Sequence, residues 1–406
     1  MGLRPSRFKV DSVQLNNPLM RALRGAELAI GSVLSLHKLD VAALEASLWM
    51  LLDTQSVGFA FQLRQRGQPL ISRHGGWAML PNEGQALWSQ QTPMMIASLS
   101  KLFTAAAAVR FLDDAGIGLD AKISPYLPGP WVKGPGVGDI SFRDLLTHRS
   151  GLNVCPFGED RIANMRAAIA DGKVIAPDYR NVNFTLIRLL MYLIHMTSGG
   201  NSAPPGVTPL PSVNTSLPVT MSDDAMEAGS IEFFDSYTQF VLFEPAGVAA
   251  SFAPPDDLAR YYTWPNPPRG VAGVDERPHA GASGWCLSAD DALRAMAAFR
   301  RRGVCLTRQR AGQLLTGGFG IDMILETDLG PLYAKNGGMS MIHVDEDGTV
   351  MGWQQCVGVL LPADMELVVF VNSNLGSAPL FLMTEVTDRI VASIRPWSPL
   401  SGSFGP

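Results

Sequence analysis

The sequence predicts an α+β fold in which helices flank an antiparallel sheet, as in an α/β sandwich. Both ends of the chain would contribute strands to this sheet, and a mostly helical subdomain would be inserted between them. Three observations predict this fold. A hairpin pattern lies before residue 98, helical patterns dominate the middle of the chain, and several strand patterns with a final helix follow residue 318.

The first elements of the predicted domain are a helix and a hairpin. Residues 1–39 lack strong periodicity and read as an N-terminal extension. Asp40 can cap a helix over residues 40–53, because the leucines in this stretch recur on one face. Residues 57–63 and 69–77 flank a turn that contains Gly67. This arrangement predicts a β-hairpin.

The middle of the chain is predicted to be helical, with one long loop. Ser98 begins an alanine-rich helix that ends near Gly116, and residues 183–197 form a second helix that is buried or half-buried. Residues 197–223 are rich in Ser, Pro, Thr, Gly and Asn and show no helical or strand period. This loop is either a lid or rim of a site, or a passive surface insertion.

The C-terminal part supplies the remaining strands. Strand patterns occur at residues 319–325, 330–335, 350–361 and 366–372, and helical patterns at 290–301 and 378–394. We therefore expect one catalytic domain over residues 40–395. Its sheet subdomain covers about 40–95 and 285–395, its helical subdomain covers about 98–284, and residues 396–406 form a tail.

The composition is that of a globular protein. The 406 residues suffice for a large core, 47% of them are hydrophobic, 17% are charged, and the net charge is −5. The sequence has no basic run interleaved with aromatic residues, so nucleic-acid binding is not expected. The most apolar stretch, residues 186–196, is short and contains Arg188 and His195, so no membrane span is expected. Asp11 and Gln14 interrupt any apolar signal segment, which favours a cytoplasmic location.

The cysteines and histidines do not predict a metal or cofactor site. The four cysteines are scattered without a C-x-x-C pair and read as buried free thiols: Cys155, Cys286, Cys305 and Cys356. His148 follows a predicted helix end, and we interpret it as a structural hydrogen-bonding residue rather than a catalytic base. No pattern indicates an oligomeric state. We expect neither a metal ion nor a cofactor.

Ser98 and Lys101 form the candidate nucleophile pair. Residues i and i+3 share a helix face, so the lysine can take or relay the proton that a serine must lose to become nucleophilic. The S-x-x-K pattern also occurs at Ser6 and Ser35. Only Ser98 follows a predicted hairpin and begins a strongly apolar helix, and it would sit where free backbone N–H groups can bind an oxyanion.

Two further motifs supply a second base and a binding strand. Tyr179-Arg180-Asn181 is the only Y-x-N motif among seven tyrosines. A phenol near two lysines can act as a general base, and Asn181 can bind an acyl carbonyl or steady Lys101. The alternative is a core tyrosine beside a helix-capping asparagine.

Lys335-Asn336-Gly337-Gly338 is the only K-x-G motif, and it is expected at the end of a strand. Glycines there let a substrate approach the strand edge. The N–H groups of Ser98 and Gly338 can together bind an oxyanion. The alternative is an exposed lysine in a glycine turn.

Over about residues 40–395, the ordered motifs resemble those of the serine β-lactamase and penicillin-binding-protein superfamily. They are most similar to its class C β-lactamase-like branch, which includes esterases, D-aminopeptidases and acyltransferases. Besides the motifs above, the resemblance rests on segments 145–152, 243–247 and 284–291 and on Asn183.

The resemblance implies a β-lactamase-like fold and a role for each motif residue. Ser98 would form an acyl-enzyme, Lys101 and Tyr179 would share base duty, and Asn181 would contact the acyl-side amide. Lys335 would support Tyr179 and attract a substrate carboxylate. Asn336 stands where β-lactamases usually have threonine or serine, which argues against efficient β-lactam hydrolysis.

The sequence therefore predicts a serine hydrolase of esterase or amidase type that acts on a small acyl substrate, namely an ester, amide or lactam. Two alternatives stay open. One is a biosynthetic acyltransferase that uses the same acyl-enzyme, and the other is a catalytically silent binding protein on this fold.

Overall fold

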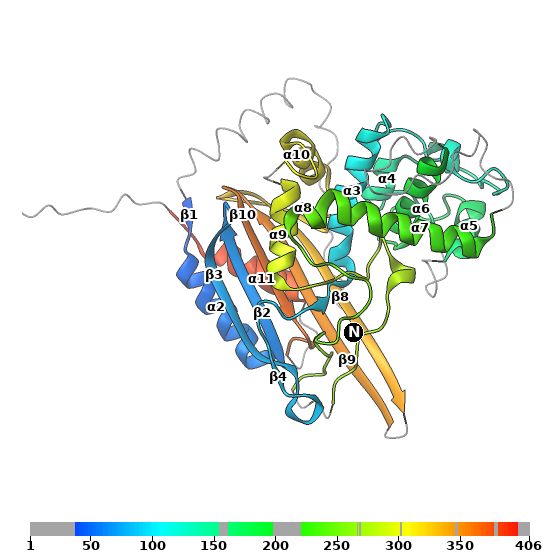
Figure 1. The fold of residues 1–406 in the computed structure, drawn as a ribbon. Coiled ribbons are helices and arrows are strands. Elements are labelled where there is room, and N and C mark those ends of the chain that lie inside the picture. The colour runs from blue at the N-terminus through cyan, green and yellow to red at the C-terminus, as the bar shows by residue number, and fades with distance from the viewer. Residues whose placement is uncertain are drawn as a thin grey trace, which may run out of the picture.

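The computed structural model describes residues 37–153, 161–197, 221–265, 267, 269–300, 303–345, 348–376 and 381–396. It has a sheet part and a helical part that lie side by side, with the long hairpin β8–β9 extending beyond both (Figure 1). The predicted 197–223 loop lies almost wholly outside the described residues, as does Cys155.

The main sheet has seven antiparallel strands in the order β4-β3-β2-β10-β9-β8-β7. The N-terminal strands are β2 (Gly58–Gln65), β3 (Gln68–Met79) and β4 (Ala86–Leu87). The C-terminal strands are β7 (Met323–Thr327), β8 (Gly330–Asp345), β9 (Gly348–Leu361) and β10 (Met365–Val371). Because β2 pairs with β10, both chain ends build this sheet, which confirms the predicted fold class.

Helices cover both faces of the sheet. α2 (Val41–Gln55) and α11 (Leu382–Ala392) pack against one face, where their leucines, Val386 and Ile390 form a core with β2, β9 and β10. α3 (Ser100–Asp114) and α9 (Ala289–Arg300) cover the other face. β10 is buried along its whole length, as expected for a strand that is covered on both sides.

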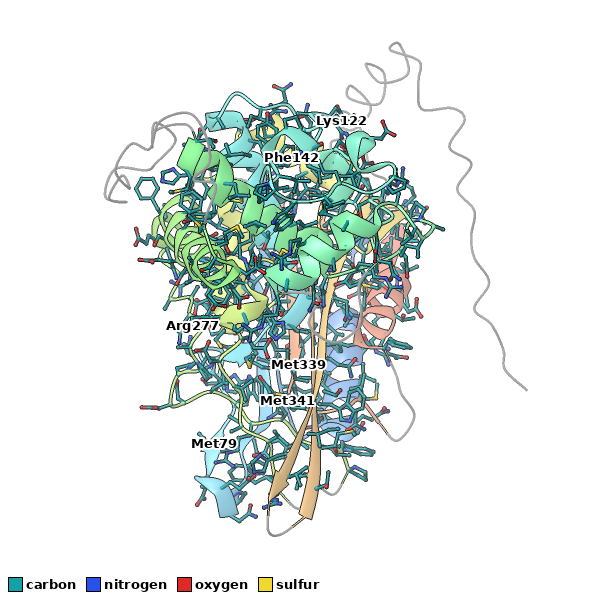
Figure 2. The ribbon with its side chains drawn as sticks, turned by 90° about the vertical axis from the view of Figure 1, so that its right-hand side faces the viewer. Met79, Lys122, Phe142, Arg277, Met339 and Met341 are labelled. Atoms are coloured by element: carbon teal, nitrogen blue, oxygen red, sulfur yellow. The ribbon has the colours of Figure 1, made fainter. Side chains whose placement is uncertain are left out.

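The helical part packs around α3, which is buried over most of its length. It comprises α4 (Phe142–Leu146), α5 (Ile162–Asp171), α6 (Val182–Thr197), α7 (Asp223–Thr238) and α8 (Glu244–Ala246). In Figure 2, Lys122 and Phe142 lie in this part, whereas Met339 and Met341 lie along β8. α10 (Arg308–Gly317) packs on α3 and α9.

Two short strand pairs complete the fold. β1 (His37–Leu39) pairs with β11 (Ile394–Pro396), so the last residues of the predicted extension and the first of the predicted tail meet. β5 (Met94–Met95) pairs with β6 (Cys286–Leu287) directly before the turn that carries Ser98.

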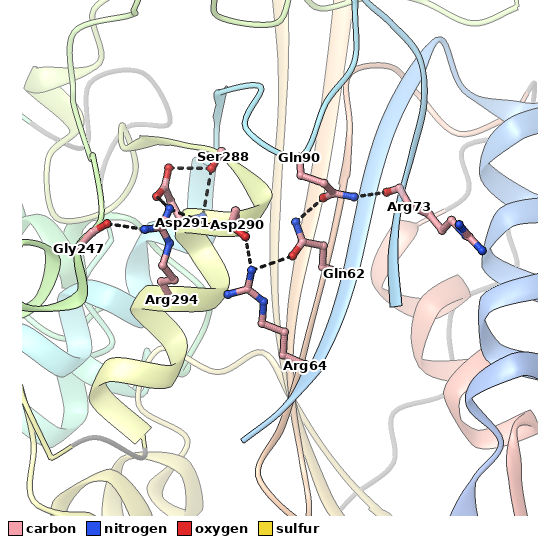
Figure 3. A network of polar contacts seen from close by, with 9 residues as sticks. All are labelled: Gln62, Arg64, Arg73, Gln90, Gly247, Ser288, Asp290, Asp291 and Arg294. Atoms are coloured by element: carbon pink, nitrogen blue, oxygen red, sulfur yellow. Dashed lines mark hydrogen bonds and ion pairs between the residues drawn. The ribbon is translucent and has the colours of Figure 1, made fainter. Parts of the chain in front are cut away.

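A polar network joins α9 to the sheet (Figure 3). Arg64 on β2 donates to Gln62 and forms an ion pair with Asp290 at the start of α9. Gln62 also donates to Gln90, whose amide donates to the carbonyl of Arg73 on β3 at 2.7 Å. These contacts hold α9 against the sheet on the face that carries α3.

Several predicted elements are confirmed with small shifts. Asp40 caps α2, the hairpin turn is reduced to Arg66 and Gly67, and both turn residues have positive φ, as a two-residue hairpin turn requires. The predicted 183–197 helix is α6. Cys286, Cys305 and Cys356 are buried free thiols, as expected, and burial raises the pKa of the Cys286 thiol to about 12.

Other expectations are corrected. The strand predicted over 319–325 starts only at Met323, because Gly318 and Gly320 adopt left-handed φ values in a turn after α10. The strand predicted to end at Lys335 continues to Asp345, because Gly337 and Gly338 stay extended and pair with β9. The helices α5, α7 and α10 were not predicted.

Candidate active site

Ser98 lies in a 3₁₀ turn, Ala97–Leu99, that leads directly into α3. The preceding residue, Ala97, has φ +43°, a conformation that L-residues rarely adopt. The turn is fixed by backbone hydrogen bonds from Ile96 N to the Trp285 carbonyl at 2.8 Å and from Leu99 N to the Ile96 carbonyl at 3.0 Å. Local strain of this kind is typical of functional sites.

Lys101 is fully buried one turn along the same helix face. Its Nζ donates to three acceptors: Ser98 Oγ at 2.9 Å, Asn181 Oδ1 at 2.8 Å and the Ala282 carbonyl at 2.8 Å. A buried ammonium group requires such partners to offset the loss of water. The structure therefore brings Ser98, Lys101 and Asn181 together. The i, i+3 spacing predicted that the first two would meet, and the contact with Asn181 corresponds to the lysine-steadying role considered for that residue.

Tyr179 lies on the other side of Ser98, with its hydroxyl 2.8 Å from Ser98 Oγ. The Nζ atoms of Lys101 and Lys335 each lie 5.0 Å from the centre of its ring. Burial alone would raise the pKa of Tyr179, but the charges of both lysines and the hydrogen bonds with Lys101 and Ser98 lower the pKa overall. A lowered pKa makes the phenol a better base near neutral pH.

Lys335 is buried beneath Tyr179 and forms an ion pair with Asp322. Its Nζ lies 2.6 Å from Asp322 Oδ1, and the other carboxylate oxygen accepts a hydrogen bond from Asn336 N at 3.0 Å. Asp322 was not among the predicted site residues.

The edge of β8 is open beside Ser98. Pairing with β7 ends at Ala334, and within the described part of the chain no strand pairs with the residues from Lys335 onward on that side. Backbone N–H groups of residues i and i+2 point to the same side of a strand, so Gly338 N–H points off the same edge as Asn336 N–H. A Cβ on Gly337 would lie 2.2 Å from the Ile96 carbonyl, so this glycine lets β8 approach the Ser98 turn closely.

His148 packs against Tyr179, with 4.2 Å between the ring centres. Its Nδ1 accepts from Arg180 N at 3.3 Å and lies 3.2 Å from Asn183 Nδ2, which assigns the proton to Nε2. Burial and the charges of Lys101 and Lys335 lower the pKa of His148 to about 3. The ring is therefore neutral at ordinary pH, in keeping with the structural role inferred from the sequence.

His148 makes the protein less stable in acid, and replacing it tests that effect. The folded-state pKa is about 3, below the ordinary 6.5, so stability is lost as pH falls from 6.5 toward 3, by at most about 1.4 kcal/mol per pH unit. His148→Asn cannot be protonated, and asparagine tolerates the φ of +56° at this position.

Urea unfolding midpoints at pH 7 and pH 5 measure this difference. We expect the midpoint of His148→Asn to fall less on acidification than that of the parent protein. Equal decreases of the urea midpoint in the parent protein and in His148→Asn would contradict the lowered pKa assigned to His148. Exposed His343→Asn serves as the matched control.

These residues line one pocket of about 530 Å³, formed by Ser98, His148, Tyr179, Ile321, Asp322, Asn336, Gly338 and Met383. All three predicted motifs thus meet at a single site, although Lys101 and Lys335 lie behind its wall. No group of three or more His, Cys, Asp or Glu side chains in the described residues is arranged to hold a metal ion. None of the helices among those residues is long and apolar enough to span a membrane.

Besides the lining residues Ile321 and Met383, three contributors to the site escaped prediction from the sequence. Asp322 lies in a turn with no motif of its own. Ala282 contributes only its backbone carbonyl, which accepts from Lys101 Nζ. Arg188, completely buried on α6, donates to the carbonyls of Pro278 and Ala280 and so holds the segment that leads to Ala282 in place.

Comparison with known families agrees with this geometry. The Beta-lactamase family model matches residues 41–193, the stretch that contains Ser98, Lys101 and Tyr179. A search of curated proteins gives no match.

Solved structures share the fold across most of the chain. A class C β-lactamase from Rhodobacter sphaeroides has a TM-score of 0.55 at 16% identity, covering 86% of this chain and 97% of the other. The D-amino acid amidase from Ochrobactrum anthropi SV3, complexed with L-phenylalanine, has a TM-score of 0.59 at 17% identity, covering 87% and 97%. SurE with D-Leu has a TM-score of 0.55 at 18% identity, covering 87% and 74%.

Residues 41–193 therefore match the Beta-lactamase family model, and the chain as a whole has a β-lactamase-like fold.

Proposed function

We propose that this protein is a serine hydrolase that cleaves small esters or amides through an acyl-enzyme on Ser98. The observation that carries the proposal is the position of Ser98 Oγ, 2.8 Å from the Tyr179 hydroxyl and 2.9 Å from Lys101 Nζ at the start of a helix. A serine with two such partners has both a base and a cation beside it, as nucleophilic catalysis requires.

The contacts of Lys101 favour Tyr179 as the base. We assign Lys101 as the ammonium form, which can donate to all three of its neighbours: Ser98 Oγ, Asn181 Oδ1 and the Ala282 carbonyl. A charged Lys101 cannot accept the serine proton, but its charge stabilises a Tyr179 phenolate. We therefore assign proton transfer to Tyr179 and electrostatic support to Lys101 and Lys335.

The proposed reaction has two steps. The Tyr179 phenolate takes the Ser98 proton while Oγ forms a bond to the acyl carbon, and the tetrahedral intermediate then breaks its bond to the leaving alcohol or amine, which receives the proton from Tyr179. In the second step Tyr179 takes a proton from water, the water oxygen bonds to the acyl carbon, and the ester bond to Ser98 breaks with return of the proton to Oγ.

The N–H groups of Ser98 and Gly338 are the proposed oxyanion donors. Gly338 N–H points off the open edge of β8, and the close approach of Gly337 to Ile96 brings that edge against the Ser98 turn. Two donors fixed by the backbone stabilise the charge that develops on the acyl oxygen in each step. Asn181, held by Lys101, is the proposed partner of the acyl-side amide.

Intact-protein mass spectrometry tests the proposal. The protein is mixed with a panel of p-nitrophenyl esters, D- and L-phenylalanine amides and a penicillin, with and without added alcohols or amines. The amides are included because one similar structure is a D-amino acid amidase. We expect an acyl adduct on the protein that disappears in water. An adduct that persists until an alcohol or amine is added would instead indicate an acyltransferase, and no adduct with any probe would favour a silent binding protein.

A further inference from the structure

We propose that Asp322 makes the substrate pocket selective for acyl donors that carry a positively charged group, and that the pocket disfavours donors with a carboxylate. This inference rests on the proposed hydrolase function and adds the charge class of its substrate. It assigns specificity to a residue outside the three sequence motifs.

The first argument is the location of charge around the pocket. Lys101 and Lys335 are both buried, with side chains that do not form the pocket lining. Among the described lining residues, Asp322 is the carboxylate, His148 is neutral at ordinary pH, and Tyr179 is either neutral or an anionic phenolate, so none of these lining residues is a cation. The Asp322 side chain is 20% exposed, whereas that of Lys335 is 0% exposed. An entering molecule therefore meets the carboxylate before it meets either lysine.

The second argument is the state of Lys335. The ion pair with Asp322 at 2.6 Å offsets the charge of the lysine and occupies one of the three hydrogen-bond positions of its Nζ. A substrate carboxylate would have to displace Asp322 or lie beside it, and two carboxylates close together repel each other. Lys335 is therefore poorly suited to the carboxylate-attracting role that the family resemblance implies.

The third argument is the occupied edge of β8. Beyond the last residue of β8 that pairs with β7, Asn336 N–H is the first backbone donor on this edge. It already donates to Asp322 Oδ2 at 3.0 Å. At this place the pocket thus offers carboxylate oxygens in place of a backbone donor. Each carboxylate oxygen has a second lone pair, so Asp322 can still accept a hydrogen bond or face a cation.

Matched thioesters measure the charge preference directly. Two sets are used, one with the variable group on the acyl side and one on the thiol side. Each set has a trimethylammonium member, a tert-butyl member of nearly the same shape and a carboxylate member. Thiol release gives kcat/KM for each. In one of the two sets we expect the trimethylammonium member to exceed the tert-butyl member about fivefold, and the carboxylate member to fall below it by a similar factor.

Asp322→Asn tests whether this carboxylate is the cause. Asparagine keeps the shape and can still accept one hydrogen bond, but the charge of Lys335 is then uncompensated. We expect the ratio of trimethylammonium to carboxylate kcat/KM to drop below one, with a smaller change for the tert-butyl member. Glu326→Gln, which removes an exposed carboxylate from the same strand β7, should leave the ratio unchanged.

The outcomes separate this inference from the proposed function. Turnover of the tert-butyl thioesters with equal rates for both charged members would overturn the inference and leave the hydrolase intact. An equal loss for all members in Asp322→Asn would show that Asp322 only positions Lys335. If Asp322→Asn does not fold, the preference of the parent protein and its decline at high salt still decide the question. No turnover of any member would count against the hydrolase itself.

Discussion

Replacement of Ser98 by alanine should abolish covalent labelling by a fluorophosphonate and reduce ester hydrolysis about a thousandfold or more. The expected effect is large because Ser98 Oγ is the proposed atom that bonds to the acyl carbon, and the neighbouring groups have no other nucleophile to activate. Alanine is compatible with the 3₁₀ turn, so the fold should persist. Intact-mass measurement of the labelled protein and the initial rate with a p-nitrophenyl ester give the two readouts.

Ser100→Ala is the matched control for this experiment. Ser100 is two residues away and fully buried, and its Oγ has no hydrogen-bond partner among the described residues. Loss of this hydroxyl should leave labelling and turnover nearly unchanged. Labelling of Ser98→Ala to the level of the parent protein would mean that the nucleophile lies elsewhere in the chain.

Replacement of Tyr179 by phenylalanine should lower kcat/KM by two orders of magnitude or more, which is a typical loss when a general base is removed. Phenylalanine keeps the ring against His148 and between the two lysines, so the change is confined to the hydroxyl that lies 2.8 Å from Ser98 Oγ. Steady-state rates as a function of pH are the measurement.

The pH profile separates a base from a structural residue. In the parent protein kcat/KM should rise with pH through the pKa of Tyr179, because the phenolate is the reactive form, and that pKa is lowered by the nearby lysines. This rise should be absent from Tyr179→Phe. Tyr126→Phe, which alters a tyrosine that packs on Phe142 and does not line the pocket, should retain the parent profile. A loss below tenfold for Tyr179→Phe would remove it from the base role.

The local parts of the site could be predicted because short-range geometry determines them. Ser98 and Lys101 share a helix face through their spacing alone, and Asn181 follows Tyr179 by two residues, so each motif brings its own members together. That the motifs meet was inferred from their order and from the family resemblance. The strands of the sheet could also be predicted from local patterns, because they are apolar runs. β10, with seven buried residues, is a clear example.

The rest depends on contacts between distant segments. Asp322 reaches Lys335 only because β7 begins at Met323 and leaves the following edge of β8 open. The residue at which a neighbouring strand begins cannot be derived from the motif that contains Lys335. The carbonyl of Ala282 carries no sequence signal, since any residue has one. α10 contains Gly312 and four polar residues in its first turns, which obscured its helical period.

The pairing of β2 with β10 has a consequence for the order in which the protein becomes active during its synthesis. Phe59 on β2 pairs with Val371 on β10, so the centre of the sheet cannot form until β10 has left the ribosome. Ser98 and Tyr179 emerge much earlier than Lys335 and Gly338. A nascent chain thus contains the serine before it contains β8, which carries Gly338 and Lys335. The site is complete only when β8, β9 and β10 have joined the sheet.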